Sequence, residues 1–127
     1  MEKTVSKSMK NKMKVLVVED CPVLRDLVAQ NIGDCIECSI DQAEDGSEAL
    51  KMLSEGSYDL CFTDHRMPLK TGKELILEAH LKGIKTPFIM FTGTPPKIKS
   101  PNLREVVCKP NIDGLKQSAL RFTEDVA

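Results

Sequence analysis

Five polar residues stand at the ends of apolar runs in this chain, and their types suit one kind of chemistry. They are Glu19, Asp20, Asp64, Thr92 and Lys109. Three carboxylates that come close together raise one another's pKa unless a cation lies among them. Mg²⁺ prefers a few carboxylate ligands and leaves positions open for phosphate oxygens, to which a hydroxyl and an ammonium can also hydrogen-bond. The set therefore indicates phosphoryl transfer, in which an aspartate can act as nucleophile and form an acyl phosphate.

These residues can meet only if the apolar runs form neighbouring strands. Apolar, β-branched runs alternate along the chain with segments in which an apolar residue recurs every three or four positions, as in buried strands and amphipathic helices. Strands are predicted near residues 14–19, 36–40, 58–63, 87–91 and 105–108. This alternation predicts an α/β fold with a doubly wound, five-stranded parallel sheet and helices on both faces. Ligands of such sheets bind beyond the carboxyl ends of the strands, where the polar residues would lie.

Local signals predict where the helices begin and end. Pro22 suits the first turn of a helix, and Gly33 can end that helix. Its apolar stripe is formed by Val23, Leu24, Leu27, Val28 and Ile32. Residues 71–74 have the form of a capping box, and Asn111 can cap the last helix. Three prolines fall between the fourth and fifth predicted strands, so the fourth helix is expected to be short or irregular, or absent.

The composition excludes several classes of protein. A chain of 127 residues with 41% hydrophobic and 29% charged residues is typical of one globular domain. Its net charge of -1 argues against nucleic acid or an anionic membrane as partner, and no apolar run approaches the length of a membrane span. Residues 1–12 contain several lysines. The apolar run that follows is too short for the core of a signal peptide. We therefore expect a flexible basic leader, followed by one domain over residues 13–127.

The five cysteines are an odd number in a chain without an export signal, which indicates reduced thiols and a cytoplasmic location. Cys35 and Cys38 have the spacing of a redox or zinc pair, but a zinc site with four ligands would need a second pair. Cys38 shares its strand parity with Ile36 and Ile40. It is therefore expected to be a small core residue.

Five segments carry a resemblance to a known family. They are residues 15–20, 43–50, 64–68 together with Gly72, 91–93 and 108–110. In this order they resemble the receiver domains of two-component response regulators, and the resemblance extends from residue 13 to about residue 122. It implies a flavodoxin-like sheet with strand order 2-1-3-4-5. It also implies a cytoplasmic signalling protein that is not a turnover enzyme.

The resemblance assigns the phosphoacceptor and the metal ligands. Asp64 would accept a phosphoryl group from a histidine kinase or a histidine phosphotransfer protein. Glu19, Asp20 and Asp64 would hold Mg²⁺ together with the main-chain carbonyl of Arg66.

Lys109 and Thr92 would act on the phosphoryl group. By the resemblance, Lys109 would pair with Asp64 and then with the phosphoryl oxygens, with its rotamer held by Pro110, which the family often has in a cis peptide. Thr92 would turn its hydroxyl toward the phosphoryl group and report phosphorylation to the output surface.

The chain departs from the family's pattern mainly on the output side. Val106 stands three residues before the lysine, where the family usually has an aromatic residue that moves inward with the threonine. Together with the prolines, this difference indicates that the phosphorylation chemistry is kept and that the output surface is rebuilt.

The sequence leaves two alternative roles for each of the residues next to the phosphoacceptor. His65 is either a local base or pH-sensitive gate, or a partly exposed ring on the opposite side of the strand from Asp64, which the two-residue period favours. Arg66 and Thr94 occupy positions that in the family influence hydrolysis of the acyl phosphate. Arg66 would either screen the phosphoryl group from water or simply be solvated.

Three functions compete. The first is a stand-alone phosphoacceptor in a two-component phosphorelay, a monomer or weak dimer that signals through altered binding of an unknown target protein. The second is a phosphorylation-independent docking module, which Val106 and the prolines favour and the intact acidic residues oppose. The third is a phosphatase of the haloacid dehalogenase type, which needs a second Asp two positions after the nucleophile, where this chain has Arg66.

Overall fold

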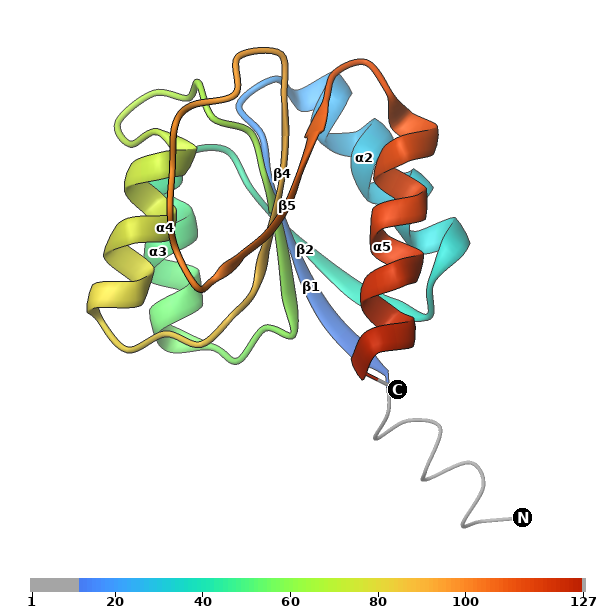
Figure 1. The fold of residues 1–127 in the computed structure, drawn as a ribbon, viewed down its shortest axis with the longest axis horizontal. Coiled ribbons are helices and arrows are strands. Elements are labelled where there is room, and N and C mark those ends of the chain that lie inside the picture. The colour runs from blue at the N-terminus through green and yellow to red at the C-terminus, as the bar shows by residue number, and fades with distance from the viewer. Residues whose placement is uncertain (1–11, 127) are drawn as a thin grey trace, which may run out of the picture.

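The computed structural model of the chain describes residues 12–126. Its strands form one parallel sheet with the order β2-β1-β3-β4-β5, as the resemblance implied (Figure 1). The strands are β1 (Met13–Val18), β2 (Cys38–Ala43), β3 (Leu60–Thr63), β4 (Phe88–Thr92) and β5 (Leu103–Cys108). The predicted α/β fold is therefore confirmed. The predicted basic leader lies outside the described residues, except for Lys12.

Helices cover both faces of the sheet. They are α2 (Pro22–Cys35), α3 (Gly46–Glu55), α4 (Gly72–Leu81) and α5 (Ile112–Val126). Figure 1 shows α2 and α5 on one face and α3 and α4 on the other. Among residues 12–126, no helix is both long enough and apolar enough to cross a membrane.

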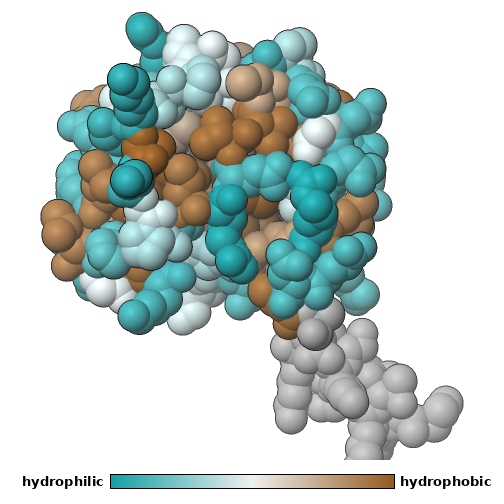
Figure 2. Space-filling model, in the orientation of Figure 1, coloured by the Kyte–Doolittle hydropathy of each residue, from teal (hydrophilic) through white to brown (hydrophobic). Residues whose placement is uncertain are grey.

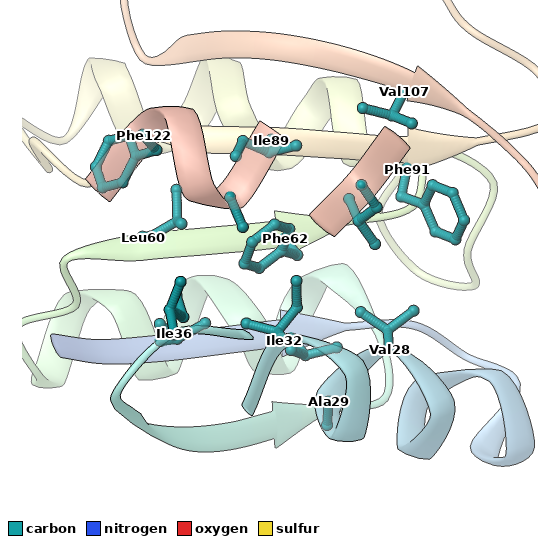
Figure 3. Packing of buried hydrophobic residues seen from close by; sticks show 14 residues of the cluster. Val28, Ala29, Ile32, Ile36, Leu60, Phe62, Ile89, Phe91, Val107 and Phe122 are labelled. Carbon is teal, nitrogen blue, oxygen red and sulfur yellow. The ribbon is translucent and has the colours of Figure 1, made fainter. Parts of the chain in front are cut away.

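The sheet separates two clusters of buried apolar side chains, because successive residues of a strand point to opposite faces. Val15 of β1 joins the cluster with residues of α2 and α5, whereas the next residue, Leu16, joins the cluster with residues of α3 and α4. Figure 3 shows the first cluster, in which Ile32 of α2 and Phe62 of β3 point toward each other. Strands β3 and β4 are buried along their whole length, which explains their continuous apolar sequence.

Residues 93–102, between β4 and β5, form no helix, which confirms the expectation from their prolines. We call them the proline segment. The segment is nevertheless fixed to the rest of the domain. Ile98 packs against the second cluster, and the Nδ2 of buried Asn102 donates hydrogen bonds to the carbonyl oxygens of Ile84 (2.8 Å) and Thr86 (3.2 Å).

The first helix and the second strand differ from their predicted bounds. Helix α2 continues beyond Gly33 to Cys35, and Gly33 does not adopt the positive φ with which a glycine commonly ends a helix. Strand β2 consequently begins at Cys38 instead of Ile36. The predicted apolar stripe of α2 was wrong in part, since Val23 is 79% exposed and Leu27 46% exposed.

The predicted caps are present. The Thr71 Oγ1 accepts a hydrogen bond from the backbone N of Glu74 (3.1 Å), and the Glu74 carboxylate accepts one from the backbone N of Thr71 (2.9 Å). This reciprocal pair is the predicted capping box. The Asn111 Oδ1 accepts from the backbone N of Gly114 (2.9 Å) at the start of α5.

Candidate functional site

An acidic cluster lies where β1 and β3 end. The two strands pair in parallel, with Val18 opposite Thr63, so the residues that follow them emerge at the same edge of the sheet. Carboxylate oxygens of Glu19, Asp20 and Asp64 lie within 4.8 Å of one another. Glu19 and Asp64 are buried, whereas Asp20 is exposed. The structure thus brings together the three carboxylates that the sequence singled out.

Lys109 reaches this cluster from the end of β5. Its Nζ donates hydrogen bonds to the Oδ2 of Asp64 (2.8 Å) and the Oε1 of Glu19 (2.9 Å). Burial lowers the pKa of the Lys109 ammonium, but the hydrogen bonds to the two carboxylates outweigh this effect and raise the pKa above its ordinary value. Lys109 is therefore a cation at neutral pH. The peptide bond between Lys109 and Pro110 is cis.

One ammonium does not neutralise three carboxylates. Burial raises the pKa of Glu19, an effect that the hydrogen bonds from Lys109 and from the backbone N of Cys21 only partly offset, and nearby Asp64 raises it further. The site therefore favours additional positive charge. Clustered carboxylate oxygens are the ligands that a hard divalent ion such as Mg²⁺ prefers, so the donor set fits this metal.

Thr92 ends β4 at the same edge of the sheet and is fully buried. Its Oγ1 accepts a hydrogen bond from the backbone N of Thr94 (3.2 Å) and lies 3.4 Å from the Thr94 Oγ1. The hydroxyl is thus linked to the start of the proline segment.

The loop after Asp64 passes very close to the first turn of α4. The backbone N of Gly72 donates to the carbonyl oxygen of His65 (2.7 Å), and a Cβ at Gly72 would lie only 2.1 Å from the carbonyl oxygen of Asp64. Only glycine fits there without movement of the backbone. Gly72 therefore allows the backbone of Asp64 to lie close against the first turn of α4.

His65 connects the same loop to α4. Its backbone N donates to the Asp64 Oδ1 (2.6 Å), and its ring Nδ1 accepts from the backbone N of Lys73 (3.4 Å). The half-buried ring therefore faces α4. Arg66, the next residue, is exposed, and the role of its carbonyl as a metal ligand stays a prediction.

Arg25 also contributes to the site by holding the backbone at Glu19, although the sequence analysis did not identify it. Its Nη1 donates to the carbonyl oxygen of Glu19 (2.8 Å) and its Nε to the Oε1 of Gln42 (3.0 Å). These bonds fix the loop between β1 and α2. The helix dipole disfavours a cation near the N-terminal end of a helix. The position of this arginine was therefore the sequence signal that could have identified it.

The remaining singled-out residues lie elsewhere. Val106 is 37% exposed on β5. Cys35 and Cys38 are half-buried free thiols that pack against the first apolar cluster, and burial raises the pKa of both. A raised pKa disfavours the reactive thiolate. In residues 12–126, the group of potential metal ligands is the acidic cluster and includes no cysteine.

Comparison with known proteins identifies the class. The family model of the response regulator receiver domain matches residues 15–115. The chain therefore belongs to the receiver domain family of response regulators. Domains of this family transmit signals and are not turnover enzymes, so the phosphatase hypothesis finds no support.

Individual relatives agree with this assignment. The chain is 36% identical over 64 residues to the chemotaxis protein CheY of Pseudomonas aeruginosa (50% of this chain, 52% of that protein). It is 35% identical over 81 residues to the transcriptional regulatory protein CiaR of Streptococcus pneumoniae (64% and 35%). The chain thus spans about half, or less, of the length of these relatives.

One solved structure is similar to this chain in both sequence and fold. The response regulator TrrA of Thermotoga maritima, in complex with Mg²⁺ and BeF, is 33% identical, with a TM-score of 0.77 over 86% of this chain and 97% of that one.

Proposed function

We propose that this chain is a phosphoacceptor in a two-component phosphorelay and that Asp64 receives the phosphoryl group. The observation that carries the proposal is the double hydrogen bond of Lys109, which joins Asp64 to Glu19 within the acidic cluster. The donor would be a histidine kinase or a histidine phosphotransfer protein. The exchange would take place in the cytoplasm, where free thiols stay reduced.

Glu19, Asp20 and Asp64 would hold Mg²⁺, with the main-chain carbonyl of Arg66 as a further ligand. The ion, when bound, would neutralise charge on the phosphoryl oxygens and on the acidic cluster. Support comes from the fit of three convergent carboxylates to a hard divalent ion. The TrrA complex contains Mg²⁺.

The chain's own residues would carry out the transfer. An oxygen of the Asp64 carboxylate attacks phosphorus, the O–P bond forms as the bond from phosphorus to the donor histidine nitrogen breaks, and that nitrogen leaves with the electron pair. Lys109 exchanges its hydrogen bond with Asp64 for one with a phosphoryl oxygen. Thr92 turns its hydroxyl from Thr94 toward the phosphoryl group. Hydrolysis of the acyl phosphate by water at the same site would reset the protein.

The output would be altered binding of a target protein. A second candidate function, docking that does not depend on phosphorylation, is favoured by Val106, which has no ring to move, and by the absence of a helix in residues 93–102. The two functions differ in whether the chain binds a phosphoryl mimic and changes its structure on binding.

Titration with Mg²⁺ and beryllofluoride, followed by NMR of the backbone amides, distinguishes the two functions. A phosphoacceptor binds the mimic only with Mg²⁺ and shifts the amide signals of Thr92 and Thr94 in addition to those near Asp64. Asp64→Asn should abolish these changes, whereas Asp113→Asn, an exposed substitution on α5, should not. Binding of neither Mg²⁺ nor beryllofluoride to the folded wild type would contradict the proposal and favour the docking module.

A further inference from the structure

A shallow groove lies between α4 and the proline segment. Its volume is about 620 Å³, and its lining residues are Lys73, Leu77, Pro96, Lys97, Ile98 and Lys99. We call it the lysine groove. Figure 2 shows apolar side chains, with hydrophilic ones between them, on the side of the molecule where α4 and the proline segment lie. The apolar stripe continues one turn along α4 to Leu81, which is 82% exposed.

The lining of the groove has one sign of charge. Three lysines contribute to it, and no carboxylate does. The two glutamates of α4 on the neighbouring turns have partners of their own: Glu74 accepts from the backbone N of Thr71 within the capping box, and Glu78 forms an ion pair with Lys70. The lysines therefore stand over a half-buried apolar floor without acidic neighbours in the groove.

The groove is built into the domain. Prolines restrict the backbone of its outer wall, and Ile98 anchors the middle of that wall in the second cluster. At the far end, Asn102 binds two carbonyl oxygens, and its Oδ1 lies 3.2 Å from the Nδ1 of His80 on α4. A surface that is already ordered loses little conformational entropy when a partner binds.

We propose that the lysine groove is a docking site for an acidic, amphipathic segment of a partner protein. Large apolar side chains of this segment would cover Leu77, Pro96 and Ile98, and its Asp or Glu residues would pair with the lysines. Charge complementarity selects this occupant: the whole chain carries a net charge of -1, yet this groove presents only cations. Phosphates of a nucleic acid would match the lysines but would leave the apolar floor uncovered.

The position of the groove connects it to the phosphoacceptor site. The proline segment begins directly after Thr92, whose hydroxyl bonds with Thr94, and its residues 96–99 form the outer wall of the groove. A movement of Thr92 on phosphorylation would therefore displace this wall and change the affinity for the partner. This connection rests on the proposed function, whereas docking itself does not.

Selection from a phage-displayed library of random peptides tests the proposal. The wild-type chain serves as bait, and the variant Lys97→Glu/Lys99→Glu is used for counter-selection. We expect the enriched peptides to combine Asp or Glu with large apolar residues. In fluorescence anisotropy with a synthetic copy of one such peptide, Lys97→Glu/Lys99→Glu should weaken binding by about tenfold or more. The matched variant Lys51→Glu/Lys85→Glu, with the same charge change at exposed positions outside the groove, should change it by less than about twofold.

Several results would overturn the proposal. Enriched peptides without acidic residues, or equal loss of binding in both charge-reversal variants, would exclude the groove as an acidic docking site. So would lysine-dependent binding of a random-sequence single-stranded DNA oligonucleotide without any enriched peptide, which would indicate nucleic acid instead. Circular dichroism and thermal unfolding of each variant show that it is folded. If the peptide binds and the intact mass shows that acetyl phosphate phosphorylates the wild type, but the affinity for the peptide does not change, docking stands and the coupling to Asp64 fails. If the mass does not change either, the proposed function fails and docking still stands.

Discussion

The Nζ of Lys109 lies 2.8 Å from the Oδ2 of Asp64, although the two residues are 45 positions apart in the chain. They follow strands that are not neighbours, because β4 lies between β3 and β5 in the sheet. The long lysine side chain spans this interval and also reaches Glu19 at the end of β1. One ammonium thus connects the ends of three strands.

Removal of this ammonium should destabilise the domain. In Lys109→Met, two buried carboxylates lose their partner, and the free energy of unfolding without metal should fall by about 1–3 kcal/mol. Urea unfolding, with and without Mg²⁺, measures the change, and exposed Lys51→Met is the control. Because Mg²⁺ would supply the missing positive charge, it should restore part of the loss. Equal stabilities of Lys109→Met and the wild type without Mg²⁺ would show that the pair is not structural.

Neutralising Glu19 should have the opposite effect on stability. Since burial raises the pKa of Glu19, the folded protein holds this proton more tightly than the unfolded chain does. The stabilising contribution of the neutral carboxyl is therefore complete below the ordinary pKa of 4.5 and is lost as the pH rises through the raised pKa of the folded state. At neutral pH, Glu19→Gln should unfold at a higher temperature than the metal-free wild type.

This gain should disappear as the pH falls below 4.5, where Glu19 itself is neutral, and Glu19→Gln should bind Mg²⁺ more weakly at neutral pH. Thermal unfolding across this pH range and calorimetric titration with Mg²⁺ measure the two effects. Glu124→Gln removes the same charge from an exposed position and should change neither the unfolding temperature nor the affinity for Mg²⁺. A lower unfolding temperature for Glu19→Gln at neutral pH would mean that the ion pair with Lys109 outweighs the burial.

Two glycines near the site should respond differently to alanine. Gly72→Ala places a Cβ 2.1 Å from the carbonyl oxygen of Asp64, and the forced backbone shift should cost about 1–3 kcal/mol or more and slow phosphorylation. Gly93→Ala meets nothing within 4 Å and should stay within about 0.5 kcal/mol of the wild type. Denaturant unfolding and the rate of phosphorylation by acetyl phosphate check both. Similar costs for the two variants would contradict the steric explanation.

Much of the site could be predicted because sheet topology and strand ends leave clear signals in the sequence. Buried parallel strands are continuous apolar runs, so the polar residue that ends each run identifies the edge where side chains converge. The prolines also predicted correctly that residues 93–102 form no regular helix.

Other features depend on tertiary contacts that no local pattern encodes. Gly33 has the residue type of a helix end, but α2 continues because its packing against the sheet outweighs the local preference. Val23 and Leu27 fit the period of a buried stripe and yet are exposed, because α2 turns Val28, Ala29 and Ile32 toward the sheet. The role of Asn102 depends on carbonyl groups that lie 16 and 18 positions away.

The most direct test is the intact mass of the chain after incubation with acetyl phosphate, with and without Mg²⁺. A phosphoacceptor gains the mass of one phosphoryl group with Mg²⁺, loses most of this gain when the metal is chelated beforehand, and gains nothing in Asp64→Asn. Asp113→Asn, on the exposed start of α5, should behave as the wild type does. An unchanged mass of the folded wild type under all conditions, or an equal gain in Asp64→Asn, would contradict the assignment of Asp64 as the phosphoacceptor.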